Sequence, residues 1–392
     1  MIRPPGPLEP EYPCAERGSK GNDDKSWLTR LARRIAPNMA TDSKKPPPSN
    51  LMRAKLEDVA RLAKVSLATA SRALNQPSIV RPVVCERVRK AAEKLSYAPD
   101  RMAKALSSGK SHTIGAVVPT LGNAIFADGV EALQERLGER GYILLLSNSQ
   151  YDKEKELRQI RALLEHGVDG LVLVGDNFAP EVIPLIQQHR IPFVTTYVCA
   201  SKNGVPAIGI DNFQATYKMT RYLMELGHRE FAIVANTALP NDRSQARLEG
   251  MLAALAEGGV HVMRNSIVET DQPSIINGRR AFASLLAVNP RLSAILCTTD
   301  ALAVGVLAEA HRSGIGVPRD MSIVGFDNVE IAAEVDPPLT TINVPAAEIS
   351  RLAADYLISA IEGNPIPMTT KLAATLIIRD STGHVRPPAQ QE

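Results

Sequence analysis

The sequence lacks the features of a membrane or secreted protein. No apolar run approaches the roughly 18 residues that a transmembrane helix needs, and the N-terminus has no apolar centre of the signal-peptide kind. We therefore expect a cytoplasmic protein that does not contact membranes. The four cysteines (Cys14, Cys85, Cys199 and Cys297) are far apart and match no zinc spacing, which indicates reduced, mostly buried thiols.

Motifs typical of enzymes are also missing. No phosphate-cradling G-x-G-x-x-G or Walker sequence follows an apolar run, and no nucleophile elbow occurs. The seven histidines are scattered without metal-ligand spacing. We therefore expect no cofactor and no metal.

The sequence does have a strongly uneven distribution of charge. The net charge is only +3, but residues 53–110 contain 13 Lys and Arg against 5 Asp and Glu, whereas residues 111–392 contain 23 against 31. A small basic region joined to a larger acidic one is typical of a nucleic-acid-binding domain attached to a different module. An imbalance that merely aids solubility is the alternative, and charge alone leaves it open.

The length of 392 residues predicts two or three folding units. Residues 1–52 are rich in proline, glycine and charge, so we expect a disordered N-terminal extension there. Because a regular apolar pattern begins only at Leu56, we expect translation to start at Met39 or Met52. Residues 383–392 are predicted to form a flexible tail.

The basic region predicts three short helices within residues 53–98. The first has an apolar face that begins at Leu56, and a tight turn then leads to Ser66, which is well placed as an N-cap. The second helix runs from Leu67 to Leu74 within the stretch "VSLATASRALNQ", whose small side chains suit a helix that lies close against another surface. The third helix starts after Pro82. Two helices joined by a three-residue turn predict a helix-turn-helix.

The pattern changes at Thr113. Short apolar runs ("TIGAVVP", "YILLLSN", "GLVLVG", "IPFVTT", "FAIVAN", "SAILCT", "SIVGF") alternate with amphipathic stretches such as 126–140 and 154–166. Continuous apolar strands separated by helices predict parallel sheets covered on both faces. Their number predicts an α/β core of two doubly wound lobes, in which a ligand would lie at the carboxyl ends of the strands.

These motifs, and the order in which they occur, resemble those of the lactose-repressor (LacI/GalR) family. "LEDVARLAKVSLATASRALNQ" is similar to its helix-turn-helix, and "SYAPDRMAKALSSGKSHTIGAVVP" to its hinge and first core strand. "ARLEGM", "TTDALAVGVLAEA" and "GIGVPRDMSIVGFDN" continue the match, which covers about residues 55–382. The resemblance implies a DNA-binding domain at 53–98, a hinge helix at 99–110 and an effector-binding core at 111–382 that is like a periplasmic binding protein. It also implies a homodimer that binds double-stranded operator DNA and is controlled by a small molecule.

The resemblance assigns roles to residues at the DNA end. It places Leu67, Ala68 and Arg72 at base-reading positions, where arginine can pair bidentately with guanine. Leu106 matches a leucine that wedges into the minor groove and kinks the duplex. The alternatives are a solvated arginine and an ordinary core leucine. Five further residues are suited to phosphate contacts: Ser66, Thr69, Ser71, Asn75 and Tyr97.

Two residues depart from the family pattern. Lys55 stands where a threonine N-cap is common, so a capping bond worth roughly 1 kcal/mol is expected to be missing. Lys64 stands where the turn often has glycine, and a left-handed backbone there costs lysine about 1 kcal/mol.

At the effector end, Arg247 and Asp327 match the best-kept polar pocket positions of the family, and both side chains can bind hydroxyl or carboxylate groups. Phe126 can stack on a sugar face, while Tyr197 and Thr299 are expected at strand ends that face the cleft. Asp242 and Arg243 are rim candidates for which a solvated loop pair is the expected alternative. The effector is expected to be a sugar, a sugar acid or a related metabolite, and the two arginines weakly favour an anionic one.

Two further interpretations compete with a DNA-binding regulator. A purely ligand-binding protein of the periplasmic type would need an export signal and would not need a basic domain. An enzyme on a doubly wound fold would need a catalytic motif. The C-terminal "DSTGHVRPPAQQE" has no leucine heptads, so a dimer without a tetramerising zipper is expected.

Overall fold

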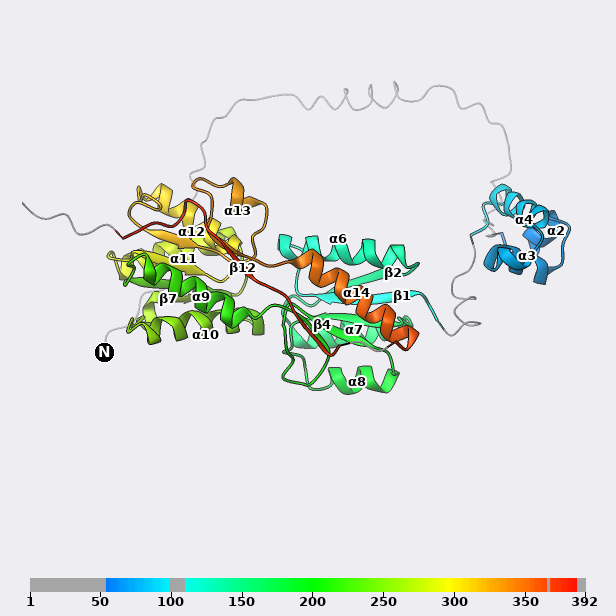
Figure 1. Cartoon of the computed structure of the whole chain (residues 1–392), viewed down its shortest axis with the longest axis horizontal. Coiled ribbons are helices and arrows are strands. Elements are labelled where there is room, and N and C mark those ends of the chain that lie inside the picture. The colour runs from blue at the N-terminus through cyan, green and yellow to red at the C-terminus, as the bar shows by residue number, and fades with distance from the viewer. Residues whose placement is uncertain (1–53, 99–109, 365–366, 386–392) are drawn as a thin grey trace, which may run out of the picture. The chain divides into compact units, whose positions relative to one another are not determined.

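The computed structural model describes residues 54–98, 110–364 and 367–385. It divides the chain after Pro99 into two compact units (Figure 1). The expectations for the extension 1–52, for nearly all of the hinge segment with Leu106, and for most of the tail lie outside the described residues.

The first unit contains the three predicted helices. They are α2 (Leu56–Leu62), α3 (Leu67–Asn75) and α4 (Pro82–Lys94), with a 3₁₀ turn, η1 (Pro77–Ile79), between the last two. Val59, Ala70 and Val88 contribute one fully buried side chain from each helix. Most of the other core residues are alanines, which allow the helix backbones to approach closely.

The ends of these helices follow the local sequence. The Ser66 hydroxyl accepts a hydrogen bond from the Thr69 amide (3.1 Å), so Ser66 caps α3 as predicted. Lys64 adopts the expected left-handed backbone, with φ of 52°. The Lys55 side chain gives no capping bond, but Asp58 Oδ2 accepts one from the Lys55 amide (3.0 Å). The missing cap is thus partly replaced by the acidic half of a capping box.

The second unit consists of two α/β lobes, each built on its own parallel sheet. The N-terminal lobe has six strands in the order β11-β5-β4-β3-β1-β2, and the C-terminal lobe has four in the order β7-β6-β8-β9. The strands are β1 (Thr113–Val118), β2 (Ile143–Asn148), β3 (Gly170–Val174), β4 (Phe193–Thr196), β5 (Ala207–Gly209), β6 (Phe231–Ala235), β7 (Ile267–Glu269), β8 (Ala294–Cys297), β9 (Ser322–Val324) and β11 (Thr369–Lys371). The prediction of two doubly wound lobes is confirmed.

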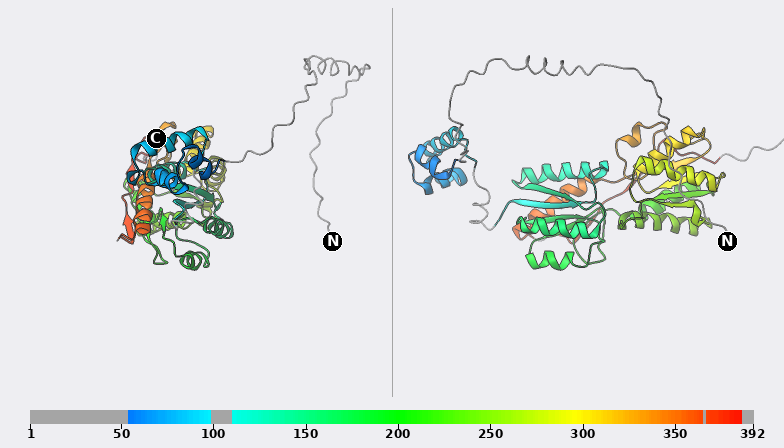
Figure 2. Two further views of the ribbon diagram at one scale, coloured as in Figure 1. Left: turned by 90° about the vertical axis from the view of Figure 1, so that its right-hand side faces the viewer. Right: turned by 180° about the vertical axis from the view of Figure 1, so that it is seen from behind.

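Helices cover both faces of each sheet, as Figures 1 and 2 show. In the N-terminal lobe α6 and α14 pack together, and α7 lies beside α8; in the C-terminal lobe the pairs are α9 with α10 and α11 with α12. The helices are α6 (Ala124–Glu139), α7 (Lys153–Glu165), α8 (Val182–His189), α9 (Asn212–Glu225), α10 (Asp242–Glu257), α11 (Ile275–Val288), α12 (Asp300–Arg312), α13 (Ile331–Glu334) and α14 (Ala346–Glu362).

The chain passes between the lobes after β5, after β10 (Thr341–Asn343) and after β11. β12 (Thr375–Ile377), which follows the last crossing, pairs antiparallel with β10. Two of the three crossing segments are therefore hydrogen-bonded to each other next to the space between the lobes.

Some details differ from the sequence-based expectation. β2 is an edge strand, and Ile143 and Leu146 are exposed rather than covered. β5, β7, β10, β11 and β12, which have three residues each, were not predicted. Cys297 is buried, but Cys85 and Cys199 are only half-buried free thiols.

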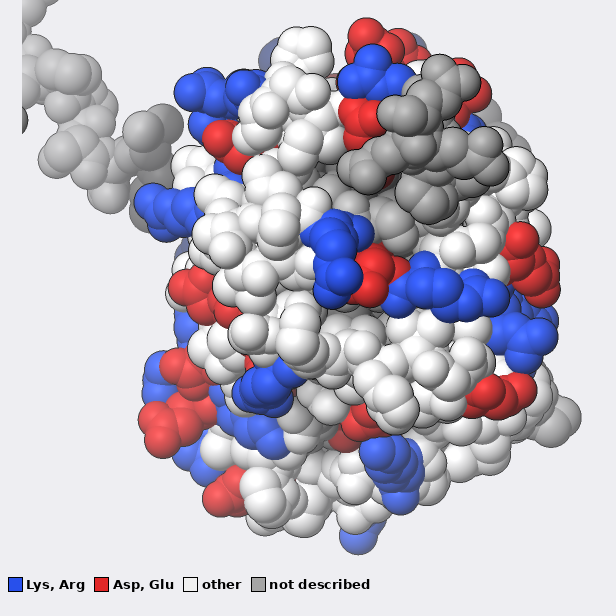
Figure 3. Space-filling model, turned by 90° about the vertical axis from the view of Figure 1, so that its left-hand side faces the viewer, with Lys and Arg blue, Asp and Glu red and all other residues white. Residues whose placement is uncertain are grey.

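In the described part of the chain, none of the helices combines the length and apolarity needed to span a membrane. The end of the C-terminal lobe seen in Figure 3 carries both signs of charge among uncharged residues. That mixture contrasts with the basic excess of residues 53–110.

Candidate DNA-binding and effector sites

Helix α3 presents the three predicted base-reading residues on one exposed surface. Leu67 is 46% exposed although it is large and apolar, and Ala68 and Arg72 are also exposed. Ala70 and Ala73, on the opposite side of the helix, are buried in the unit. Among the residues that the structure describes, none forms a hydrogen bond or an ion pair with the Arg72 side chain, whereas its carbonyl oxygen accepts a hydrogen bond from the Gln76 amide (2.7 Å). Its guanidinium is therefore available to an outside acceptor.

The predicted phosphate-contacting residues flank this surface. The hydroxyls of Ser66 and Thr69 lie 2.8 Å apart at the N-terminus of α3, where the helix dipole favours an anion. Asn75 Nδ2 donates to the Ser71 carbonyl oxygen (3.0 Å) at the other end of the helix. Tyr97 is half-buried against the small alanine-rich core. The roles of these residues, and of Leu106 outside the described ranges, stay predictions.

All five predicted effector residues line one small cavity between the lobes, which we call the inner chamber. Its volume is about 20 Å³. Its walls come from segments that follow the strand ends of both sheets: Asn123, Ile125, Phe126, Tyr151, Tyr197, Asn236, Asn241, Arg243, Arg247, Thr299 and Asp327. This is the position expected for a ligand site in such folds. The structure brings the five residues together, and what they bind stays a prediction.

Strained backbone is concentrated around the inner chamber. Tyr151, Tyr197 and Asp327 have φ angles of 62°, 64° and 122°, and Gln150 and Asn328 beside them also lie at positive φ. Such conformations cost non-glycine residues of order 1–3 kcal/mol each and cluster at functional sites. The Phe126 ring packs edge-on against Tyr197, with 5.4 Å between centroids, and the Tyr197 hydroxyl donates to the Ile125 carbonyl oxygen (3.2 Å).

Arg247 is held in place from several sides. Its Nε donates to Asn212 Oδ1 (2.9 Å), and its Nη1 donates to the Thr298 carbonyl oxygen (2.8 Å) and lies 3.4 Å from Asp327 Oδ1. The guanidinium carbon also stacks 3.7 Å from the centre of the Phe326 ring. These contacts pre-organise Arg247, so little side-chain freedom is left to lose on ligand binding.

Three buried carboxyl groups near this site have raised pKa values. Burial raises the pKa of Asp327 to about 7, against the opposing effect of Arg247. Burial likewise raises the pKa of Glu156 to about 7, opposed by Arg243, and that of Asp300 to about 6, opposed by its hydrogen bond from Thr341. Perturbed carboxyl groups in a cleft are typical of functional sites.

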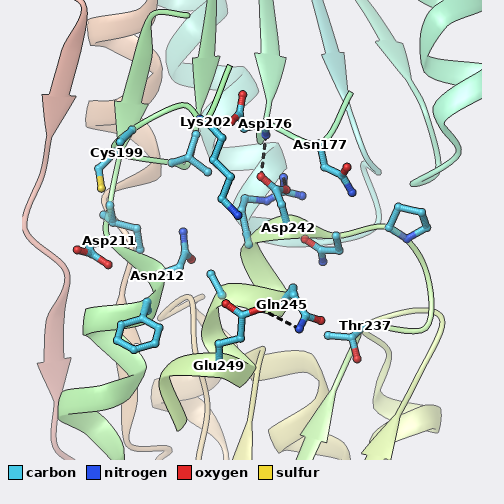
Figure 4. A pocket seen from close by; sticks show the side chains of 18 of the residues that line it. Asp176, Asn177, Cys199, Lys202, Asp211, Asn212, Thr237, Asp242, Gln245 and Glu249 are labelled. Carbon is cyan, nitrogen blue, oxygen red and sulfur yellow. Dashed lines mark hydrogen bonds and ion pairs between the residues drawn. The ribbon is translucent and has the colours of Figure 1, made fainter. Parts of the chain in front are cut away.

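A larger cavity of about 750 Å³, which we call the outer cavity, adjoins the inner chamber. Asn241 and Arg243 line both spaces. Figure 4 shows the Lys202 side chain extending into the outer cavity, with Gln245 and Glu249 on α10 below it. An Asp242 carboxylate oxygen accepts a hydrogen bond from the Asp176 amide (2.7 Å), which joins the two lobes at the edge of this cavity. A volume of 750 Å³ suits a small organic ligand.

The structure corrects one expectation and adds residues that the sequence did not reveal. Arg243 is not part of a solvated pair, because it is only 6% exposed in the first turn of α10. Asn123, Tyr151 and Asn236 were missed. Each follows a strand closely, so the rule that ligands lie at carboxyl strand ends could have suggested them, but no residue type marked them out.

Matches to known proteins extend over nearly all of the residues that the structure describes. The model for "Bacterial regulatory proteins, lacI family" matches residues 55–100, and that for "Periplasmic binding protein-like domain" matches residues 220–382. The transcriptional repressor CytR of Escherichia coli K12 is 32% identical over 332 residues, which are 84% of this chain and 96% of CytR.

Two solved structures extend the similarity to three dimensions. The lac repressor dimer bound to operator and the anti-inducer ONPF has a TM-score of 0.75 at 25% identity and covers 84% of this chain and 99% of its own. The transcriptional regulator CelR in complex with cellobiose has a TM-score of 0.62 at 27% identity, and the match covers 84% of this chain and 100% of the CelR chain.

Proposed function

Because the chain belongs to the lacI family of bacterial regulatory proteins, we propose that it represses transcription from a palindromic operator that it reads through α3. It is a DNA-binding transcription regulator with a small-molecule effector. A location in the cytoplasm, where its DNA target lies, belongs to this proposal. A purely ligand-binding protein is disfavoured, since the lacI-family match falls on residues 55–100, which such a protein would not need.

The exposed surface of α3 carries the DNA-binding part of the proposal. Small side chains at the start of the helix let its backbone approach the floor of the major groove, and Arg72 then reaches a guanine edge. Leu67 and Ala68 offer apolar contact to thymine methyl groups. The hydroxyls of Ser66 and Thr69 at the helix N-terminus bind the adjacent phosphate.

The effector part rests on the inner chamber and the outer cavity. Both lobes contribute walls, so a ligand bound there interacts differently with open and closed arrangements of the lobes, and this difference is what shifts a conformational equilibrium. A sugar or sugar acid fits the polar walls. The coupling runs through the N-terminal lobe, whose strand β1 begins directly after the hinge segment. Such coupling is typically worth 1–3 kcal/mol.

Selection of binding sites from a random DNA library by the full-length protein tests the DNA-binding part. A two-fold symmetric consensus with a guanine in each half-site is expected. Recovery of DNA without any consensus would contradict the proposal. A thermal-shift screen of the same protein against sugars and sugar acids tests the effector part, with Asp327→Asn as the variant that should lose the shift.

A further inference from the structure

Arg243 lies where the inner chamber, the outer cavity and a third small space beside Glu156 meet. We propose that the effector is a hydroxylated carboxylic acid and that Arg243 selects it by binding its carboxylate. This inference rests on the proposed effector site and adds the chemical class of the ligand and the residue that chooses it.

The guanidinium of Arg243 has unused donors. Nη1 donates to Asp242 Oδ1 (2.8 Å), which is its one hydrogen bond to a residue within the described ranges. No buried side-chain nitrogen or oxygen in that part of the chain lacks a partner. The remaining N–H groups of Arg243 therefore open onto the cavities. Two parallel N–H donors match the two oxygens of a carboxylate.

The backbone makes room for this guanidinium. Gly175 follows β3 with φ of +83°, and a Cβ atom added there would clash with Nη1 of Arg243 and with the Asp242 carboxylate. Any larger residue at position 175 would displace the pair from the wall of the cavities. Glycine at position 175, in the opposite lobe, thus leaves room for the Arg243 side chain.

The inner chamber offers mainly donors. Asn236 Oδ1 accepts from the Ser244 hydroxyl (2.7 Å), and Asn241 Oδ1 accepts from the Ser244 amide (3.3 Å), so both side-chain NH₂ groups remain. Thr299 Oγ1 accepts from the Leu302 amide (3.4 Å), which leaves its O–H to donate. A site rich in donors selects a ligand group rich in acceptors.

The charges in the inner chamber also favour an anion. Asp242 is occupied by Arg243 and by the Asp176 amide. Glu156 lines the third space and Asp327 lines the inner chamber, and since burial raises the pKa of each to about 7, neither carries a full charge at neutral pH. The third space also contains Asp152, and the outer cavity contains Asp176, Asp211 and Glu249 together with Lys153 and Lys202. In the inner chamber, Arg243 and Arg247 therefore face a single, partly neutral carboxyl group, that of Asp327, and this local excess of positive charge is available to the ligand.

The cavity volumes set the position of the ligand. An inner chamber of about 20 Å³ has room for about one water molecule, whereas the outer cavity of about 750 Å³ has room for a whole metabolite. With its carboxylate on Arg243, the acid extends its hydroxyl groups into the outer cavity. Lys202, Gln245 and Glu249 line that cavity with groups that can donate to or accept from hydroxyls.

Calorimetric titration of the full-length protein with matched pairs tests the inference: D-gluconate and D-glucose, D-galactonate and D-galactose, and D-glucuronate and methyl D-glucuronate. We expect at least one acid to bind and its neutral counterpart to bind at least about 30-fold more weakly, the loss expected for one charged hydrogen-bonded pair. Glucose 6-phosphate forms a separate arm, which distinguishes a phosphate from a carboxylate.

Variants separate this inference from the proposed function. Arg243→Met should lose the preference for the acid, and Arg243→Lys should recover part of it, while Arg264→Met, at a side chain that is 88% exposed, should bind like the wild type. A neutral sugar that binds equally well, and is lost in Asp327→Asn but not in Arg243→Met, would overturn the carboxylate assignment and leave the effector site standing. Binding of the phosphate alone, or of no acid, would also overturn it.

Discussion

Replacement of Arg72 by alanine should remove discrimination at one base position of each half-site. The side chain is exposed on α3, without a partner among the described residues, and is free to fork onto guanine. One bidentate contact discriminates by about 1–3 kcal/mol, and a dimer makes it twice. The loss for the preferred operator is therefore about 2–6 kcal/mol, from about 30-fold to about 10⁴-fold in affinity.

Fluorescence anisotropy measures this effect. Wild type and Arg72→Ala are titrated with the selected operator, with the operator changed at the guanine, and with an unrelated duplex, all at one salt concentration. The variant should bind the first two operators alike, and its affinity for the unrelated duplex should stay near that of the wild type. Lys90→Ala, at an exposed position of α4, is the control. An equal loss of affinity on all three duplexes would show that Arg72 binds phosphate rather than a guanine base.

Three further predictions concern stability and DNA bending. Lys64→Gly should stabilise the isolated DNA-binding unit by about 1 kcal/mol, because glycine accepts the left-handed backbone at φ 52° without strain; an unchanged urea midpoint would contradict this. In the folded protein Asp327 has a pKa of about 7, above its value in the unfolded chain. Between about pH 4 and pH 7 the folded chain therefore keeps a proton that the unfolded chain has lost. As a result, the free energy of unfolding falls as the pH rises through this range. The melting temperature of Asp327→Asn, relative to that of the wild type, should therefore increase as the pH is raised from 5 to 8. A difference in melting temperature that does not change with pH would argue against the raised pKa. Leu106→Ala should weaken operator binding and abolish the DNA bend in a gel-permutation assay, and an unchanged bend would exclude the wedge.

The fold was largely predictable because it depends on patterns that extend over several residues. The runs that became β1, β3, β4, β6 and β8 are continuous apolar segments that alternate with amphipathic stretches, and this pattern predicts parallel sheets covered on both faces. The exposure of β2 was not predictable. Whether a strand lies at a sheet edge depends on the order of strands, and that order is a property of the whole topology.

The site was only partly predictable for a similar reason. Arg247 and Asp327 stand in motifs that resemble those of a known family, so their meeting in the inner chamber was expected. Tyr151 reaches the chamber through two successive residues at positive φ, which neither sequence period nor residue type revealed. For Arg243, a solvated pair with Asp242 was the expected alternative. Its burial could not be predicted, because it depends on Gly175 in the opposite lobe, 68 positions earlier in the chain.

We propose that a ligand held between the lobes controls sequence-specific DNA binding. The most direct test is the dissociation constant of the full-length protein for its selected operator, measured with and without a saturating effector from the calorimetric panel. We expect a change of about 5-fold to 150-fold in the wild type and no change in Asp327→Asn. An operator affinity that is the same with and without bound ligand would contradict it.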